Sequence, residues 1–244
     1  LSEAHPGLEY VFFVDGDCAI AQGFVETAVK FLDQHTDVAA VWGRRRELFP
    51  DGSLYNRICD IEWSQVPVGE TETFGGDVFV RASAVREVGG YDPRLSAGED
   101  PELAYRLHKA GHRIFRLDAD MTLHDASITR FSQWWKRTKR SGYAYAQVST
   151  LHAREAERFW QKDKQRALLW GLFVPLGVPL FALATLGMSS LALAAYPIRA
   201  LRVASRAHKQ RALDMRQAGA WALHCVGASF PQAAGILKFY AERA

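Results

Sequence analysis

The chain has 244 residues, of which 48% are hydrophobic, and a formal net charge of +3. This length is enough for one large domain or two small ones, each with a sizeable core. The 3 cysteines are an odd number without C-x-x-C spacing, so neither a disulfide framework nor a zinc site is indicated, and we expect a reducing, cytosolic environment.

The charge is unevenly distributed along the chain. Residues 1–129 carry 12 Lys and Arg against 22 Asp and Glu, whereas residues 130–216 carry 16 against 4. We therefore expect the two parts to have different partners. The chain begins at Leu1 without an initiator Met or a secretory signal, and it reaches an apolar strand within 10 residues, so we expect a piece of a longer protein.

The first predicted element is a strand that ends in two carboxylates. The apolar run Tyr10–Val14 is typical of a parallel strand covered on both faces, and Asp15 and Asp17 follow at its carboxyl end, where open α/β sheets bind ligands. Extended residues two apart point the same way, so both carboxylates can reach one cation, with Gly16 permitting close approach. Oxygen ligands favour Mg²⁺ or Mn²⁺. The alternative is a polar turn.

The following pattern predicts an α/β fold. Apolar residues at helical spacing from Phe24 to Leu32 precede a second apolar strand, Val38–Trp42. We predict a loop over residues 43–53, which contains three consecutive arginines, interpreted as a solvated charge run with phosphate contact as the alternative. Further predictions are a helix over 54–61, a strand over 78–80, a helix from Ser83, a helix over 100–110 with Asp100 as its N-cap, and strands over 114–117 and 121–123.

A long apolar segment is the clearest membrane signal. Residues 167–198 contain no charged side chain over 32 positions, more than the roughly 20 that cross a bilayer. Basic residues lie on both sides, so a single span would place one group against the positive-inside rule. We favour a helical hairpin or re-entrant element with both ends cytoplasmic, while a single span and a buried soluble hairpin are alternatives.

The region before this segment combines tryptophans with basic residues. Trp134, Trp135, Arg137 and Arg140 fit an interfacial helix, with aromatic rings at headgroup level and cations toward anionic lipid or diphosphate. Ordinary packing of the two tryptophans is the alternative. This composition also occurs in proteins that bind single-stranded nucleic acid, but the adjoining apolar segment favours a membrane partner over nucleic acid.

Four motifs in order carry a family resemblance. They are F-V-D-G-D at 13–17, F-G-G-D-V-F-V-R at 74–81, V-G-G-Y-D at 88–92 and G-E-D-P-E-L-A-Y-R-L-H-K-A-G-H-R-I at 98–114. Together they resemble the family-2 glycosyltransferases, whose catalytic domain has the GT-A fold. The resemblance covers about residues 8–150 and implies a GT-A-like mixed sheet flanked by helices, followed by an α-helical membrane-associated region.

The resemblance also implies roles for individual residues. Asp15 and Asp17 would bind the divalent metal that bridges the diphosphate of a nucleotide-sugar, and His124 would complete the metal shell. Asp100 would be the general base for the acceptor hydroxyl, with Glu99 as its neighbour, and one in-line attack would invert the product stereochemistry.

Other motif residues are less distinctive. Gly75, Gly76 and Asp77 resemble the segment near the donor or acceptor sugar, although the glycines are also compatible with a structural turn. The sequence Q-W-W-K-R at 133–137 lacks the order of the family's Q-x-x-R-W motif, which argues against a processive polymer synthase.

The leading hypothesis is an inverting, metal-dependent glycosyltransferase at the cytoplasmic face of the cytoplasmic membrane, with a nucleotide-sugar donor and a glycan or lipid-linked acceptor. The predicted regions are the C-terminal part of a GT-A domain over 1–128, interfacial helices over 129–166, a transmembrane hairpin or span over 167–198, and basic amphipathic helices over 199–244.

Family members begin with a region that binds the nucleotide, so we expect this sheet to be incomplete at its N-terminus and this chain to be inactive alone. The alternatives are a haloacid-dehalogenase-type phosphatase, which also has a strand leading into Asp-x-Asp, and a non-catalytic membrane-anchored binding module.

Overall fold

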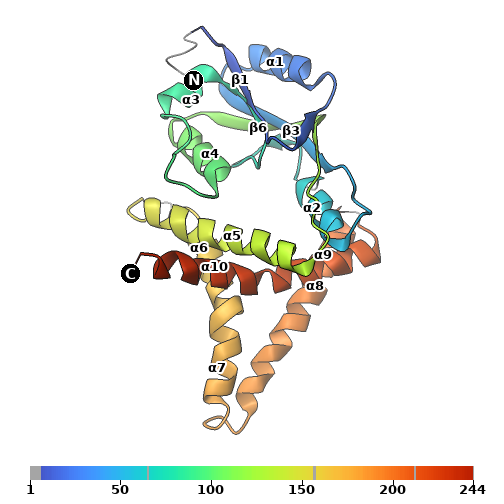
Figure 1. Ribbon diagram of the computed structural model, residues 1–244, viewed down its shortest axis with the longest axis vertical. Coiled ribbons are helices and arrows are strands. Elements are labelled where there is room, and N and C mark those ends of the chain that lie inside the picture. Colours follow the sequence, from blue (N-terminus) through green and yellow to red (C-terminus); the bar gives the residue numbers. More distant parts are fainter. Residues whose placement is uncertain (1–6, 65, 156–157, 212, 244) are drawn as a thin grey trace. The chain divides into compact units, whose positions relative to one another are not determined.

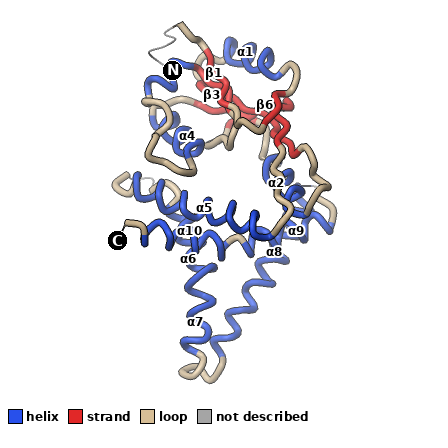
Figure 2. The backbone as a smooth tube through the Cα atoms, in the orientation of Figure 1, coloured by secondary structure: helices blue, strands red, loops and turns tan. Residues whose placement is uncertain are grey.

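A computed structural model describes residues 7–64, 66–155, 158–211 and 213–243. The chain forms two compact units, Leu1–Ser127 and Ile128–Ala244. The described strands all belong to the first unit, and the second unit is helical (Figures 1 and 2).

The first unit is built around a mixed β-sheet. Its strand order is β1-β5-β3-β6-β2, with β4 also paired to β6. The β3–β6 pair is parallel, whereas the other described pairs are antiparallel. This confirms the predicted α/β class with a mixed sheet. The elements are β1 (Tyr10–Phe13), β2 (Cys18–Ile20), α1 (Phe24–Gln34), β3 (Val38–Glu47), α2 (Leu54–Ser64), β4 (Gly69–Glu70), β5 (Val78–Arg81), α3 (Ala82–Glu87), α4 (Glu99–Lys109) and β6 (Arg113–His124).

Three predictions about strands need correction. β1 lies at one end of the sheet path, pairs antiparallel with β5, and is half-buried, rather than being a parallel strand covered on both faces. β3 continues to Glu47 through the predicted loop because its ladder with β6 extends to the Glu47–His124 pair. The two short strands predicted over 114–117 and 121–123 are one strand, β6, because the same ladder bridges them.

The core lies between the sheet and its helices. On α1, Phe24, Ala28 and Leu32 recur every four residues and are buried, as the period of an amphipathic helix requires. On α4, Leu103 and Leu107 are fully buried in the same core cluster. Figure 1 shows α1 and α4 on opposite sides of the sheet. These two layers hold the strand ends, and the loops that follow them, in fixed positions.

The second unit contains α5 (Phe131–Leu151), α6 (Gln161–Leu168), the π-helical turn η1 (Leu169–Phe173), α7 (Val174–Phe181), the 3₁₀ segment η2 (Met188–Ala194), α8 (Ala195–Arg211), α9 (Met215–Gly227) and α10 (Ser229–Ala241). α5 and α10 lie side by side (Figure 1). Glycines allow their close approach: a Cβ on Gly142 would lie 2.0 Å from the Gln232 carbonyl oxygen, and one on Gly235 would lie 2.0 Å from the Lys139 carbonyl oxygen.

The predicted transmembrane element over residues 167–198 is not supported by the structure. Among the residues that the structure describes, no helix is both long enough and apolar enough to cross a bilayer. The apolar segment is divided among η1, α7 and η2, and a turn interrupts it at Leu186 and Gly187, whose φ angles are 50° and 82°. Left-handed backbone at two successive positions cannot continue a right-handed helix. α7 and α8 form the two arms of a hairpin, the arrangement that the sequence favoured (Figure 1).

The α5–α10 contact makes a prediction about stability. We expect Gly142→Ala to lower the free energy of unfolding by about 1–3 kcal/mol, because the added methyl must push the α10 backbone away. Gly219→Ala is the matched control in α9, where no described atom lies within 4 Å of the added Cβ. Because alanine has a higher helix propensity than glycine, this substitution should raise the free energy of unfolding by about 0.5–1 kcal/mol. Urea unfolding followed by circular dichroism measures both, and equal effects of the two substitutions would contradict the close contact.

Candidate active site

Four side chains with metal-ligating atoms gather beside the end of β6. The candidate ligand atoms of Asp15, Asp17, Cys18 and His124 all lie within 4.8 Å of one another. The antiparallel β2–β6 pair places Cys18 opposite His124, so the turn after β1 returns across the end of β6. The Asp17 Oδ2 atom lies 3.3 Å from the His124 Nε2 atom. The structure thus brings together the three residues that the sequence proposed as metal ligands.

The chemistry of this cluster fits a hard divalent cation. Both carboxylates are exposed, whereas His124 is half-buried, and its buried Nδ1 atom has no hydrogen-bond partner in the part of the chain that the structure describes. Burial lowers the pKa of His124, which favours the neutral imidazole that a metal requires. Burial also raises the pKa of the Cys18 thiol to about 12, which disfavours the thiolate that soft metals select. Carboxylate oxygens with one imidazole suit Mn²⁺ or Mg²⁺.

Asp77 holds the backbone of Asp15, the first candidate metal ligand, in place. We expected it near a bound sugar, but its side chain is fully buried. Its Oδ1 atom accepts a hydrogen bond of 2.8 Å from the Asp15 backbone N–H, and its Oδ2 atom accepts one of 2.5 Å from the Thr122 hydroxyl. With no exposed surface, Asp77 acts by positioning Asp15 at the end of β1.

The three consecutive arginines have different environments because side chains alternate along β3. Arg44 and Arg46 are partly exposed and pair with carboxylates of β6 and α2. Arg45 is buried: its Nη2 atom donates a 2.8 Å hydrogen bond to Asp15 Oδ2, and its guanidinium carbon lies 4.8 Å from the centre of the Trp63 ring. The interpretation as a solvated charge run is therefore wrong for Arg45.

Asp100 lies at the start of α4 without capping it. The helix begins at Glu99 and has Gly98 at its N-cap position, two residues before the predicted N-cap Asp100. The Asp100 carboxylate instead accepts hydrogen bonds from the Gly76 backbone N–H, at 3.0 Å, and from the Tyr91 hydroxyl, at 2.9 Å. Burial, reinforced by the neighbouring Glu99 carboxylate, raises the pKa of Asp100 to about 7. Asp100 can therefore exchange a proton near neutral pH.

The glycine segment links the metal cluster to Asp100. Asp77 binds the backbone of Asp15, and the residue just before it, Gly76, donates its N–H to Asp100. Gly76 has φ of +81°, which strains other residues, and a Cβ there would lie 1.7 Å from the Arg45 Nη1 atom, so a larger residue would also displace the guanidinium. Gly75 is exposed and has nothing within 4 Å of an added Cβ, so no such requirement applies to it.

The other predicted binding residues belong to the second unit. Trp134 is buried on α5, and its indole Nε1–H donates a 2.9 Å hydrogen bond to His224 Nδ1, which fits the packing alternative. The Trp135 ring lies 5.8 Å from that of Phe131, centre to centre. On the same helix Arg137 is half-buried and Arg140 is exposed.

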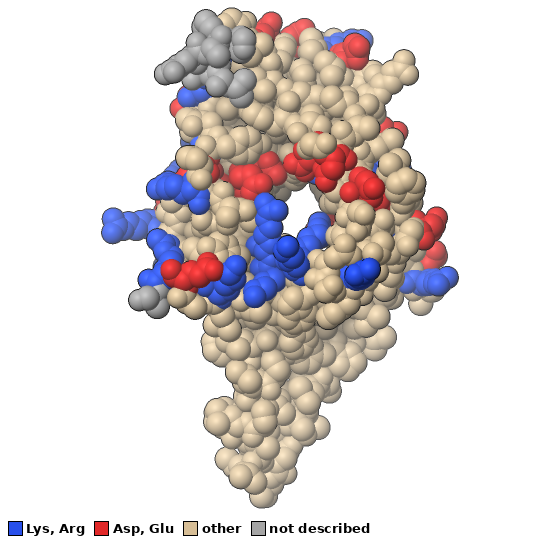
Figure 3. Space-filling model, in the orientation of Figure 1, with Lys and Arg blue, Asp and Glu red and all other residues tan. Residues whose placement is uncertain are grey.

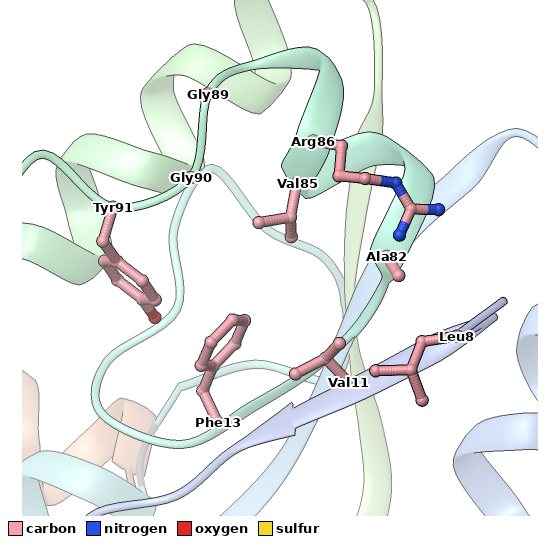
Figure 4. A pocket seen from close by; sticks show the side chains of 9 residues that line it. All are labelled: Leu8, Val11, Phe13, Ala82, Val85, Arg86, Gly89, Gly90 and Tyr91. Carbon is pink, nitrogen blue, oxygen red and sulfur yellow. The ribbon is translucent and has the colours of Figure 1, made fainter. Parts of the chain in front are cut away.

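A separate apolar pocket of about 460 Å³ opens beside Tyr91 (Figure 4). The rings of Tyr91 and Phe13 meet edge to face at its wall, with centroids 5.0 Å apart. Figure 4 shows the Arg86 guanidinium pointing away from the pocket. None of the four clustered metal-ligating residues lines this pocket; its lining residues are Leu8, Val11, Phe13, Ala82, Val85, Arg86, Gly89, Gly90 and Tyr91.

Sequence reasoning missed four residues of the site, namely Cys18, Arg45, Tyr91 and Thr122. The signals were weak: Cys18 directly follows Asp17, and Tyr91 lies within the V-G-G-Y-D motif. Strand alternation selects Arg45 from its neighbours only once β3 is known to continue to Glu47.

Comparison with known proteins identifies relatives of this chain. The family model described as "Glycosyl transferase family group 2" matches residues 10–205. The pre-mycofactocin glycosyltransferase of Mycobacterium tuberculosis is 27% identical over 154 residues, which cover 59% of this chain and 32% of that protein. The succinoglycan biosynthesis protein ExoA of Rhizobium meliloti is 47% identical over 51 residues, 21% of this chain and 16% of that protein. The chain therefore matches about a third or less of the length of these curated relatives.

A solved structure shows the same fold. The mannosyltransferase PcManGT from Pyrobaculum calidifontis, in complex with GDP-Man and Mn²⁺, superposes with a TM-score of 0.57 at 19% identity, covering 97% of this chain and 65% of that one. At this identity the likeness shows the fold alone. The mixed sheet with its flanking helices resembles the GT-A fold predicted from the motifs.

The raised pKa of Asp100 predicts how stability depends on pH. Between its ordinary value of 3.8 and about 7, the folded chain keeps the proton that the unfolded chain has lost. The free energy of unfolding should therefore fall as the pH rises through this window. We expect the wild type to lose about 1–3 kcal/mol more between pH 5 and pH 8 than Asp100→Asn, which cannot ionise.

Urea unfolding at the two pH values measures this difference. Asp118→Asn is the control, because the Asp118 side chain is 71% exposed. The prediction fails if Asp100→Asn has the same pH dependence as the wild type.

Proposed function

The chain belongs to glycosyl transferase family group 2, and we propose that it transfers a sugar from a nucleotide-diphosphate sugar to a hydroxyl of a glycan or lipid-linked acceptor, with metal dependence and inversion. One observation carries the proposal: residues 76 and 77, adjacent in the chain, connect a cluster of metal-ligating side chains to a buried carboxylate that titrates near neutral pH. A metal site and a base so closely linked suit a reaction in which one group leaves as another attacks.

On the donor side, Asp15, Asp17 and His124 would hold the metal. A bound Mn²⁺ or Mg²⁺ offsets the negative charge that develops on the departing diphosphate. The similar solved structure is that of a mannosyltransferase in complex with GDP-Man and Mn²⁺, which supports a nucleotide-sugar donor and favours Mn²⁺. Asp77 fixes the backbone of Asp15, so the carboxylate is positioned before a ligand arrives.

On the acceptor side, Asp100 would take the proton from the attacking hydroxyl. Its two hydrogen bonds, from Gly76 N–H and the Tyr91 hydroxyl, orient the carboxylate. A base with a pKa near 7 is well matched to general-base catalysis at neutral pH. Direct attack by the activated hydroxyl, opposite the departing diphosphate, inverts the configuration at the anomeric carbon. The family assignment favours neither the phosphatase nor the non-catalytic binding module.

We further propose that the hairpin of the second unit, residues 173–201, inserts into the cytoplasmic face of the cytoplasmic membrane. Its apolar side chains are exposed to an extent unusual for a folded protein. Leu183 and Leu186 at the tip are 93% and 94% exposed, and the other exposed apolar residues of the hairpin are Phe173, Leu176, Leu180, Phe181, Met188, Leu191, Leu193, Ile198 and Leu201. Figure 3 shows no Lys, Arg, Asp or Glu on the visible face of the hairpin's outer part.

The base of this hairpin has the residues expected at a membrane surface. The Arg199 guanidinium carbon lies 4.1 Å from the centre of the Trp170 ring, and Tyr196 also packs on that ring. Aromatic rings with adjacent cations favour the headgroup layer. The 8 residues of α7 span about 12 Å, less than half of a hydrocarbon core of about 30 Å, so α7 alone cannot cross it. Insertion of the hairpin would bring the enzyme to lipid-linked acceptors.

Removal of the proposed metal ligand Asp15 or of the proposed base Asp100 should greatly slow sugar transfer. In the natural full-length protein, we expect Asp15→Ala and Asp100→Asn each to lower kcat at least about 100-fold, because one removes a metal ligand and the other the base. Transfer from a panel of nucleotide-sugars measures this, with Asp118→Asn as an exposed-carboxylate control. Unchanged transfer in both site variants would refute these roles.

Charging the hairpin tip should release the protein from membranes. We expect Leu183→Glu with Leu186→Glu to reduce co-sedimentation with phosphatidylcholine–phosphatidylglycerol vesicles at least about tenfold, because a buried charge is costly in hydrocarbon. The matched control, Leu54→Glu with Val68→Glu, changes two apolar residues of the first unit that are each 55% exposed. Equal sedimentation of the two double variants would argue against insertion of the hairpin.

A further inference from the structure

We propose that Arg45 makes metal binding and diphosphate binding depend on each other: its cation weakens the binding of the divalent metal alone and strengthens the binding of the metal together with a nucleoside diphosphate. This inference rests on the proposed metal site at Asp15 and Asp17. It adds a residue from the middle of β3 to that site and assigns it a role in the order of ligand binding.

The Arg45 side chain is fixed on several sides. It is 7% exposed, its Nη2 atom donates to Asp15 Oδ2 at 2.8 Å, and its Nε atom lies 3.9 Å from Asp77 Oδ2. Its Nη1 atom fills the position that a Cβ on Gly76 would need, at 1.7 Å, and Trp63 stacks on the guanidinium at 4.8 Å. Arg45 would lose its contacts with Asp15, Asp77 and Trp63 if it left the site, so a metal ion that binds Asp15 is expected to bind beside this cation.

The position is costly for a purely structural ion pair. The Arg45 Nε atom is buried and has no hydrogen-bond partner among the described residues, and an unsatisfied buried donor lowers stability. An anionic ligand bound beside Asp15 would offset this cost through the charge of the whole guanidinium, without reaching Nε itself. Asp15 Oδ2 is held by Arg45, whereas the hydrogen bonds of the described residues do not include Asp15 Oδ1, which leaves that oxygen for a metal.

The two effects have opposite signs. In the absence of a diphosphate, a dication that approaches Asp15 is repelled by the guanidinium. The dication must also share the Asp15 carboxylate, whose charge Arg45 already partly neutralises. A diphosphate carries several negative charges and reverses this balance, because its oxygens are attracted by both cations. The coupling is reciprocal, so the diphosphate also binds better with the metal than without it.

A structural role for Arg45 makes a different prediction. If Arg45 only orients the Asp15 carboxylate, its removal should weaken metal binding both with and without the diphosphate. If Arg45 couples the two ligands, its removal should tighten the binding of the metal alone and weaken that of the metal with the diphosphate. The sign of the first change therefore separates the two roles.

Calorimetry and Mn²⁺ electron paramagnetic resonance on the natural full-length protein test this sign. We expect Arg45→Met to bind Mn²⁺ alone about 3–10-fold more tightly, and to bind Mn²⁺ in the presence of saturating GDP, UDP, ADP or CDP, whichever the wild type prefers, about tenfold more weakly. Arg44→Met is the matched control, because it removes the same charge from an exposed neighbour that pairs with Asp118 and Asp120. Arg45→Gln is the second neutral variant, should Arg45→Met fail to fold.

The outcomes distinguish this inference from the proposed function. Tighter Mn²⁺ binding without nucleotide and weaker binding with it, in Arg45→Met or Arg45→Gln but not Arg44→Met, supports the coupling. Mn²⁺ binding that is unchanged or weaker in the absence of nucleotide overturns the coupling and leaves the metal site intact. A wild-type protein that binds no Mn²⁺ with any of the four nucleotides, or whose binding survives Asp15→Ala, overturns the metal site and the inference with it.

Discussion

The fully buried carboxylate of Asp77 is the interaction on which the candidate site depends. A buried carboxylate costs several kcal/mol unless donors surround it. Asp77 receives hydrogen bonds from the Asp15 backbone N–H and the Thr122 hydroxyl, and the Arg45 guanidinium lies nearby. These partners come from the loop after β1, from β6 and from β3, so a single charge joins three parts of the sheet that are distant in the chain. The geometry of the site is therefore part of the fold.

The residue before Asp77 extends this arrangement to a second carboxylate. Gly76 donates its N–H to Asp100, which the Tyr91 hydroxyl also contacts, in surroundings that hold the pKa of Asp100 near neutrality. The backbone between residues 76 and 77 consequently connects an exposed cluster suited to a metal with a largely buried group suited to proton transfer. Displacement of this segment would disturb both the metal cluster and Asp100. The position of residue 76 is restricted by its backbone angle and by the adjacent Arg45 side chain.

The two compact units use charge in different ways. In the first unit, the candidate site brings together several carboxylates, of which Asp15 pairs with the buried Arg45 and Asp77 is itself fully buried. In the second unit, basic and aromatic residues lie at the base of a hairpin whose outer part is apolar and exposed. The uneven charge along the sequence is thus divided between the two units, with the candidate metal cluster in the first and the basic and aromatic residues of the hairpin base in the second.

The sequence by itself determined the local features of this protein. The apolar strand that ends in Asp15 and Asp17, the helical period of α1 and the order of four motifs are patterns of neighbouring residues, and they correctly indicated the α/β class and the family. Only the tertiary structure decided which of three arginines is buried and that Asp100 bonds to Gly76 instead of capping its own helix. Both findings depend on which distant segments of the chain lie together. The alternation of side chains along β3 identifies the buried arginine only when both ends of that strand are known. For residues 167–198 the sequence favoured a hairpin, but only the structure places its turn, at Leu186 and Gly187, and leaves no described helix long and apolar enough to cross a bilayer, because left-handed backbone at two successive positions ends a right-handed helix.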